Sequence, residues 1–344
     1  MSKRVLVVDD SPLFADVMRD MLRGGGLEVV GVACDGAQAV RMTHALQPDI
    51  VTMDVLMPVM NGLTAIEEIM ATRPTPILVL SGDPRGRAGE LTFEALRRGA
   101  LDVMAKPERW PAPRKESDAL VDRVRFLASV PVVRHLQAHR HRWQRAARVE
   151  ATSSRIEAVG IVASTGGPRA LSVVLGGLGE DFPLPILVVQ HLAAGFTAGL
   201  CTWLARVCPL RVREADEGAS LDPGTVYIAP QDRHLLVDDA RRIRLDDGPP
   251  VAGHRASGTL LLRALARVHR HRALGIVLTG MGQDGAEGLL ELHRAGGPTI
   301  VQDAATSIVD GMPGAARKLG AARWVTPLSE IAAVVTELTR DAAR

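Results

Sequence analysis

The sequence predicts two consecutive α/β domains, each built on a largely parallel β-sheet between layers of helices. Short apolar runs alternate with helical patterns along most of the chain, as in parallel sheets whose strands are connected by helices. The length of 344 residues suits two domains, and a 47% hydrophobic content supplies two cores. We therefore divide the chain into a first domain at residues 1–106, a linker at 107–155 and a second domain at 156–344.

The first domain shows five strand patterns, each followed by a helical pattern, which predicts a five-stranded parallel sheet. Ser11 and Pro12 begin the first helix as N-cap and first-turn residues, and the glycines at 24–26 end it. The five predicted strands are Arg4–Val8, Glu28–Val32, Ile50–Met53, Pro76–Leu80 and Leu101–Met104.

Polar side chains follow four of these strands. Asp9 and Asp10 follow the first strand, Asp54 the third, Ser81 the fourth and Lys106 the fifth. Ligands of parallel sheets bind at the carboxyl ends of the strands, so we expect these residues to lie together. Three carboxylates suit Mg²⁺, and one of them can attack a phosphoryl donor whose oxygens the metal neutralises. Each of these residues alone could serve as a helix cap or turn residue. Five such residues at the ends of the strands favour a phosphorylation site instead.

The motifs VLVVDDSP, MDVLMPVMNG, LSG and AKP resemble the response-regulator receiver domain. The resemblance covers the whole first domain and implies a flavodoxin-like fold. It also implies that a histidine kinase phosphorylates Asp54 and that Mg²⁺ binds to Asp9, Asp10 and Asp54. Ser81 and Lys106 would then contact the phosphate.

Two positions depart from the receiver pattern. Val103 stands three residues before Lys106, where receivers often carry an aromatic switch residue. Asn61 replaces the aspartate that is usual before the glycine of this turn, and asparagine suits a turn. We therefore expect phosphorylation without an aromatic switch.

The basic excess of the chain lies in residues 107–155. Their formal net charge is +6, against −3 for residues 1–106 and −1 for residues 156–344. A solvated linker explains such a stretch more commonly than nucleic-acid binding, and an aromatic content of 3% argues against a base-stacking surface. His135 and His139 have the spacing of a metal-ligand pair, but without a carboxylate ligand nearby we favour a solvated segment.

A break and a helix are predicted within this linker. Trp110, Pro111 and Pro113 end the first domain, Ser117 can cap a helix, and Pro131 follows its end. We interpret the helix as an amphipathic tether between the two domains. Its apolar face consists of Leu120, Val121, Val124, Leu127 and Ala128.

The second domain repeats the alternation and predicts a doubly wound, mostly parallel sheet with an antiparallel insertion. Ile161–Ala163 reads as a buried strand, Gly166 and Gly167 allow a tight turn, and Pro168 suits the start of a helix. Further strands are expected at Pro185–Gln190, Gly224–Ala229, Leu274–Thr279 and Thr299–Gln302, a hairpin at Asp238–Arg244, and helices at Ala198–Val207, at Ser257–His269 and at the C-terminus.

Ser164 lies where the first strand of this domain turns into a helix, so helix amides point toward it. Alone, it is well explained as a helix N-cap, and its surroundings do not form the G-x-S-x-G elbow. His191 and Asp284 follow later strands, and each alone is explained by a core histidine or a turn aspartate. Together, the three supply a nucleophile, a base and an orienting carboxylate at one sheet edge.

The motifs VASTGGP, VVQHL, YIAPQDRHL, LTGMGQDGAEGLL and MPGAA resemble the catalytic domain of the chemotaxis protein-glutamate methylesterases. With the receiver motifs, the resemblance spans the chain apart from the linker. It implies a phosphorylation-activated serine esterase that hydrolyses glutamate methyl esters on methyl-accepting chemotaxis receptors, releases methanol and deamidates receptor glutamines. Ser164 would be the nucleophile, His191 the base and Asp284 its orienting partner. No cofactor is expected for hydrolysis.

The oxyanion hole and the rim of the cleft are less defined by the sequence. Glycine loops expose backbone amides, so candidate oxyanion donors are the amides of Thr165, Gly166, Met281 and Gly282. Residues 192–194 replace a methionine and a proline expected after the histidine, which would alter receptor preference rather than chemistry. Gln231, Asp232 and His234 belong either to the cleft or to a surface turn.

Several classes are excluded or disfavoured by composition. No apolar run is long enough to span a membrane, and the N-terminus does not form a signal peptide, so we expect a cytoplasmic protein that is not membrane-inserted, and a monomer. Cys34, Cys201 and Cys208 indicate neither a disulfide framework nor a zinc site. The remaining alternatives are a non-catalytic signalling module, a transcriptional regulator, which the sheet-rich second domain disfavours, and a hydrolase of small esters.

Overall fold

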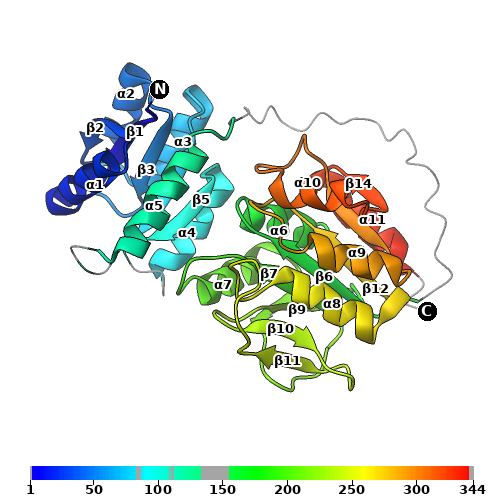
Figure 1. Cartoon of the computed structure of the whole chain (residues 1–344). Helices are drawn as coiled ribbons and strands as arrows, with labels where there is room; N and C mark the ends of the chain where they lie inside the picture. The colour runs from blue at the N-terminus through cyan, green and yellow to red at the C-terminus, as the bar shows by residue number, and fades with distance from the viewer. Residues whose placement is uncertain (1, 83–86, 108, 110–111, 133–154, 341–344) are drawn as a thin grey trace. The chain divides into compact units, whose positions relative to one another are not determined.

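The computed structural model describes residues 2–82, 87–107, 109, 112–132 and 155–340, which form two compact units (Figure 1). The first unit falls within residues 1–140 and the second within 141–344. The predictions for Trp110 and Pro111, and those for His135 and His139, lie outside the described residues.

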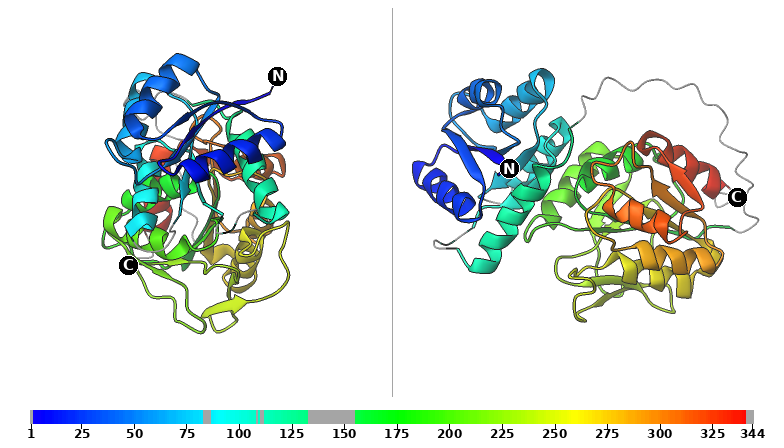
Figure 2. Two further views of the ribbon diagram at one scale, coloured as in Figure 1. Left: turned by 90° about the vertical axis from the view of Figure 1, so that its left-hand side faces the viewer. Right: turned by 45° about the horizontal axis from the view of Figure 1, so that its top comes forward.

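The first unit contains the predicted five-stranded parallel sheet, with strand order β2-β1-β3-β4-β5. Its strands are β1 Arg4–Val8, β2 Glu28–Ala33, β3 Ile50–Asp54, β4 Ile77–Ser81 and β5 Asp102–Ala105. Its helices are α1 Pro12–Gly24, α2 Gly36–Leu46, α3 Gly62–Thr72, α4 Arg87–Arg98 and α5 Arg114–Leu127. Helices α1 and α5 pack together on one face, and α2, α3 and α4 form a row on the other. Helices therefore cover both faces of the sheet, as Figure 2 also shows.

Two caps fix the loops that follow β1 and β3. Ser11 caps α1, its hydroxyl accepting a hydrogen bond of 3.4 Å from the amide of Phe14, as predicted. Asn61 caps α3, its side chain accepting from the amide of Thr64 at 3.0 Å. At Gly62 a Cβ would lie 2.1 Å from the carbonyl oxygen of Asp54. The Asn-Gly pair therefore lets α3 begin directly against the end of β3.

Helix α5 corrects the interpretation of residues 114–127 as a tether. Leu120, Val124 and Leu127 are buried, and the helix packs against α1, β3 and β4. Burial of an apolar stripe stabilises by about 25 cal/mol per Å², so an amphipathic helix next to an open sheet face docks on it. The helix begins after Pro113 without a side-chain cap, so Ser117 does not cap it. The first unit thus extends past the expected boundary at residue 106.

The second unit contains a seven-stranded sheet in which all neighbouring strands are parallel, with order β14-β13-β12-β6-β7-β9-β8. The predicted antiparallel insertion forms a separate two-stranded sheet. The seven strands are β6 Ala158–Ala163, β7 Ile186–Gln190, β8 Arg211–Glu214, β9 Thr225–Ile228, β12 Ala273–Val277, β13 Thr299–Gln302 and β14 Trp324–Thr326, and the insertion pairs β10 His234–Val237 with β11 Ile243–Asp246.

Helices cover both faces of this sheet (Figure 1). Helices α8, α9 and α10 pack in sequence on one face, and α6 packs with α7 and α11 on the other. The bounds are α6 Gly167–Gly176, α7 Thr197–Val207, α8 Gly258–Val268, η1 Arg270–Arg272, α9 Ala286–Arg294, α10 Gly311–Lys318 and α11 Leu328–Thr339. Within the described part of the chain, every helix is too short or too polar to cross a lipid bilayer.

The strand order reverses at β6, and this reversal opens the crevice where the site lies. From β6 the chain continues to β7 on one side, whereas β12, β13 and β14 extend the sheet on the other side. The loops that leave the carboxyl ends of β6 and β12 therefore diverge. In open α/β sheets, such a point is where ligands bind.

Two glycines let α8 and α9 approach the sheet closely, Gly160 against α8 and Gly275 against α9. Gly160 of β6 and Gly275 of β12 are paired in register. A Cβ at Gly160 would lie 2.5 Å from Cδ1 of Leu265, and one at Gly275 would lie 2.7 Å from Cδ1 of Leu289. The N-terminus of α8 also lies directly on the sheet, since a Cβ at Gly258 would lie 2.1 Å from Cγ1 of Val162. There the hydroxyl of Thr259 accepts a hydrogen bond of 2.8 Å from the amide of Gly285 in the loop after β12.

We expect Gly160→Val to lower the free energy of unfolding of the second unit by about 1–3 kcal/mol, because the added side chain overpacks against Leu265. Urea unfolding of the full chain, followed by circular dichroism, measures the change. Gly176→Ala is the matched control, since its nearest contact would be an ordinary 3.4 Å. Equal stability of the Gly160 variant and the wild type would contradict the packing argument.

Candidate active site and acidic site

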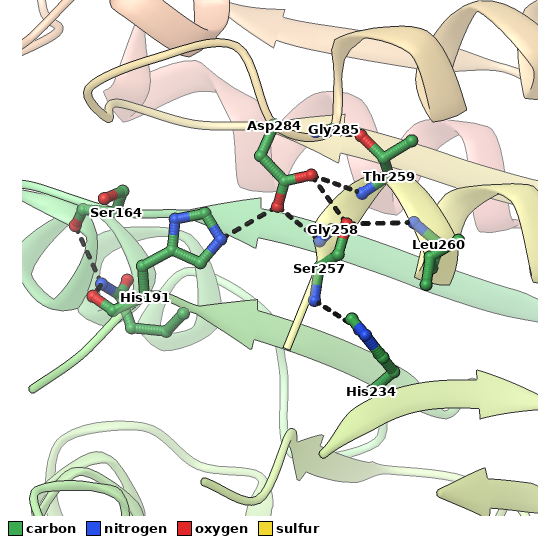
Figure 3. A network of polar contacts seen from close by, with 10 residues as sticks. Ser164, His191, His234, Ser257, Gly258, Thr259, Leu260, Asp284 and Gly285 are labelled. Atoms are coloured by element: carbon green, nitrogen blue, oxygen red, sulfur yellow. Dashed lines mark hydrogen bonds and ion pairs between the residues drawn. The ribbon is translucent and has the colours of Figure 1, made fainter. Parts of the chain in front are cut away.

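Three adjacent central strands bring Ser164, His191 and Asp284 together. Ser164 follows β6, His191 follows β7, and Asp284 lies in the loop after β12. Figure 3 shows the imidazole of His191 between the other two side chains. The residues expected at one sheet edge therefore lie side by side in the structure.

The turn after β6 holds Ser164 rigidly and leaves helix capping to another residue. Gly166, with a φ of +76°, occupies the N-cap position of α6. The amide of Ser164 donates to the carbonyl of Thr279 at 3.1 Å, and the carbonyl of Ser164 accepts from the amide of Gly167 at 2.7 Å. Gln190 donates from Nε2 to the same carbonyl at 2.8 Å. The hydroxyl of Ser164 is therefore not needed as a helix cap.

His191 has one nitrogen engaged and one without a partner. Its Nε2 forms a hydrogen bond of 2.9 Å with Oδ2 of Asp284. Its Nδ1 is buried and has no hydrogen-bond partner among the described residues. Since an ionised carboxylate only accepts, Nε2 carries the proton and Nδ1 presents a lone pair. Catalytic hydrogen bonds are often loose before substrate binds, so the absence of a bond between Ser164 and the ring in the described structure is compatible with a base at Nδ1.

Asp284 is buried and accepts four hydrogen bonds. Oδ1 accepts from the hydroxyl of Ser257 at 2.9 Å and from the amide of Thr259 at 3.0 Å. Oδ2 accepts from the amide of Gly258 at 2.6 Å in addition to His191. The carboxylate thus sits on the N-terminus of α8, where the helix dipole favours negative charge.

These contacts set the charge of Asp284. Burial alone would raise the pKa of Asp284, but the hydrogen bond and charge of His191 and the amides of Thr259 and Gly258 hold it well below the ordinary value. The group therefore stays ionised through the pH range in which an imidazole titrates. An ionised Asp284 keeps the proton of His191 on Nε2.

A further layer, formed by Ser257 and His234, supports the carboxylate, and of these two only His234 was considered as a cleft residue from the sequence. Ser257 caps α8 by accepting from the amide of Leu260 at 3.4 Å. The amide of Ser257 donates to Nδ1 of His234 at 3.1 Å, and Nε2 of His234 lies 3.1 Å from the carbonyl of Pro249. In the sequence, the role of Ser257 is indicated only by its place before a glycine at the start of a predicted helix.

The candidate oxyanion donors border Ser164. Among the residues that the structure describes, the amides of Gly166, Met281 and Gly282 donate no hydrogen bond. A Cβ at Gly280 would lie 2.7 Å from Cβ of Ser164, so the loop that carries Met281 passes directly beside the serine. The carbonyl of the fourth candidate, Thr165, accepts from the hydroxyl of Thr279 at 3.0 Å. These positions stay candidates for stabilising an oxyanion.

Two cavities lie at the site, one lined by His191 and the other by Asp284. The smaller, of about 200 Å³, is lined by His191 and also by Leu192, Gln231 and Asp232. The larger, of about 1040 Å³, is lined by Asp284 and residues of α9 and α10. Gln231 and Asp232 thus belong to a cavity wall beside the site, whereas His234 is buried beneath it.

In the first unit, Asp9, Asp10 and Asp54 lie together at the carboxyl edge. One oxygen of each lies within 4.8 Å of the others, a set that fits a divalent cation such as Mg²⁺. Lys106 Nζ lies 2.5 Å from Oδ2 of Asp9 and 2.6 Å from Oδ2 of Asp54. Burial raises the pKa of Asp9, although the ammonium of Lys106 opposes this shift. Burial lowers the pKa of Lys106, but the two carboxylates outweigh it and the net shift is upward.

The remaining predicted residues of this edge lie close by. Ser81 ends β4 and pairs in register with Ala105 of β5, and its carbonyl accepts from the amide of Lys106 at 2.8 Å. Val103 is buried in β5, so this position carries a core side chain.

Comparison with known proteins identifies the family. A family model described as CheB methylesterase matches residues 159–335, and one described as response regulator receiver domain matches residues 5–112. The chain belongs to the CheB methylesterase family. It is 49% identical to protein-glutamate methylesterase/protein-glutamine glutaminase 2 of Anaeromyxobacter dehalogenans, over 98% of this chain and 97% of that protein.

Two further matches extend the family assignment. A protein-glutamate methylesterase/protein-glutamine glutaminase 4 of Geobacter metallireducens is 40% identical over 98% of this chain and 99% of its own length. The crystal structure of the Thermotoga maritima CheB methylesterase catalytic domain, 36% identical, covers 54% of this chain and all of that chain with a TM-score of 0.52. The second unit therefore has the fold of a CheB catalytic domain.

We expect Asp284→Asn to lower the free energy of unfolding at pH 7 by about 1–3 kcal/mol, because it removes a charged acceptor from buried donors. The pKa of Asp284 is lowered by folding, so its contribution is present above the unfolded value near 3.8 and is lost as pH falls through the folded value. Urea unfolding at pH 7 and pH 3.5 measures this change. The difference in the free energy of unfolding between wild type and variant should be smaller at pH 3.5 than at pH 7. An equal difference at both pH values would contradict an ionised Asp284.

Proposed function

We propose that this protein is a phosphorylation-activated serine esterase that hydrolyses glutamate methyl esters on methyl-accepting chemotaxis receptors and deamidates receptor glutamines. The main support for this chemistry is the position of the His191 imidazole, which is hydrogen-bonded through Nε2 to Asp284 and lies next to Ser164 (Figure 3). The names of the full-length relatives, protein-glutamate methylesterase/protein-glutamine glutaminase, support glutamate methyl esters and glutamines as the groups acted on.

Acylation uses the three side chains in sequence. The hydroxyl oxygen of Ser164 forms a bond to the γ-carbonyl carbon of the ester while Nδ1 of His191 takes the hydroxyl proton. The imidazolium is stabilised by the carboxylate of Asp284. The amides of Gly166, Met281 and Gly282 are the proposed donors to the oxyanion.

Collapse of the tetrahedral intermediate breaks the bond to the leaving group. The imidazolium returns its proton to the departing oxygen, so methanol leaves and an acyl-serine stays behind. Water then attacks the acyl carbon with His191 again as the base, which releases a glutamate carboxylate and regenerates Ser164. A glutamine side chain follows the same steps with ammonia as the leaving group.

The first unit supplies the proposed control. A histidine kinase transfers a phosphoryl group to a carboxylate oxygen of Asp54, and Lys106 and Ser81 then contact the phosphate. Mg²⁺ held by Asp9, Asp10 and Asp54 would neutralise the phosphoryl oxygens during this transfer. Because the transfer adds charge beside the half-buried Lys106, the ion pairs of this ammonium with Asp9 and Asp54 must rearrange.

We propose that the unphosphorylated receiver restrains the esterase and that phosphorylation relieves this restraint. The two units belong to one chain, so the local concentration of the receiver around the site is high. A change in the surface of the first unit can then alter access to Ser164 without any change in the triad.

Ser164→Ala should abolish methanol release, with kcat falling on the order of 10⁴- to 10⁶-fold, because no other group replaces the nucleophile. Purified protein mixed with receptor membranes carrying radiolabelled methyl esters measures volatile methanol. Ser172→Ala, in the helix α6 that follows Ser164, is the matched control. A turnover number of the Ser164 variant close to that of wild type would contradict the role of Ser164 as the nucleophile. Hydrolysis of small esters without any release from receptors would instead support a general esterase.

Phosphorylation should raise the rate by roughly 5- to 150-fold, the range of typical coupling free energies between sites. The same assay is run with and without a small-molecule phosphodonor and Mg²⁺, on wild type and on Asp54→Asn. The variant should not respond, because it lacks the carboxylate that accepts the phosphoryl group. An equal response of both proteins would show that activation does not pass through Asp54.

A further inference from the structure

The ring of His254 is stacked on the imidazole of His191. The ring centroids are 3.8 Å apart, and the two planes differ by 2°. His254 comes from the segment between β11 and α8, so it reaches His191 from outside the strands that carry the triad. The sequence interpretation assigned it no role.

The segment that carries His254 is anchored on both sides. Val251 and His254 exchange two backbone hydrogen bonds, of 3.0 and 2.9 Å. The guanidinium of Arg255 donates to the carbonyls of Asp247 and Gly248 at 3.0 and 3.2 Å, and it pairs with Asp232 at 3.3 Å. The next residue but one is Ser257, which donates to Asp284. The ring of His254 is therefore presented by a fixed turn.

His191 needs such support because a single hydrogen bond does not fix a ring. Its only side-chain bond in the described structure runs from Nε2 to Asp284, and the ring can tilt about that bond. A tilt moves Nδ1 away from Ser164, and misplacement of a catalytic group by about 1 Å can cost on the order of 100-fold in rate. A parallel ring in contact with one face opposes this tilt.

We propose that His254 is a positioning residue, which holds the plane of the His191 imidazole by stacking and offers its π face to the imidazolium formed during acyl transfer. The proposal rests on the proposed esterase function. His254 lines both cavities of the site, and His191 lines the smaller of them. The stacked ring of His254 covers one face of the base.

Three substitutions separate stacking from other roles. His254→Ala removes the ring, His254→Asn keeps a polar group without an aromatic face, and His254→Phe keeps the face without ring nitrogens. We expect kcat for methanol release to fall on the order of 10- to 100-fold in the Ala and Asn variants with KM nearly unchanged. The Phe variant should recover most of the wild-type kcat. His271→Ala, an exposed histidine in η1, is the matched control.

A spectroscopic measurement tests the stack without any substrate. In wild type labelled with isotopic histidine, the carbon-bound ring protons of His191 should show the upfield shift caused by a stacked ring. This shift should persist in His254→Phe and disappear in His254→Ala and His254→Asn. His191→Gln identifies the resonances.

The kinetic results decide whether His254 acts by stacking. Wild-type kcat in His254→Ala, or activity recovered by Asn but not by Phe, would overturn the proposal, the latter pointing to a hydrogen-bonding role. Should the Ala variant fail to fold, the comparison of Phe with Asn still decides. Failure of wild type to release methanol would count against the proposed function alone, since the ring-proton shift is measured without catalysis.

Discussion

The arrangement of the second unit depends on one interaction, the buried carboxylate of Asp284 at the N-terminus of α8. A buried charge without partners is very costly, and the amides of Gly258 and Thr259 remove most of that cost. These amides are within reach because α8 packs closely on β6, which Gly160 and Gly258 permit. One packing constraint in the core thus fixes the orienting end of the proposed triad.

Both units use the carboxyl edge of a parallel sheet in the same physical way. In the first unit, Lys106 bridges Asp9 and Asp54, and in the second, His191 contacts Asp284. Each arrangement holds a carboxylate against a side-chain nitrogen at the carboxyl ends of the strands. Removing one partner of a buried pair leaves an uncompensated charge, which is costly, so each pair constrains the side chains that form it.

Much of this organisation could be predicted from the sequence, because strand periodicity and residues at strand ends are local signals. The strands of both sheets were predicted with two exceptions. Strand β8 has the polar sequence RVRE, and β14 has only three residues, so neither carries an apolar pattern. The docking of α5 and the stack of His254 could not be predicted, since both are contacts between segments distant in sequence.

A second histidine shows what distinguishes the proposed base. His269 also lies against a carboxylate, with Nδ1 3.1 Å from Glu157 and a buried Nε2 that has no partner in the described structure. Glu157, however, precedes β6 and lies at the amino edge of the sheet, where Arg241 and Arg272 also bind it. Burial lowers the pKa of His269, and Ser164 lies at the opposite edge of the sheet, after the carboxyl end of β6. A histidine next to a carboxylate is therefore not sufficient to form the proposed catalytic site. The carboxyl edge of the sheet adds Ser164 and the positive N-terminal ends of α6 and α8.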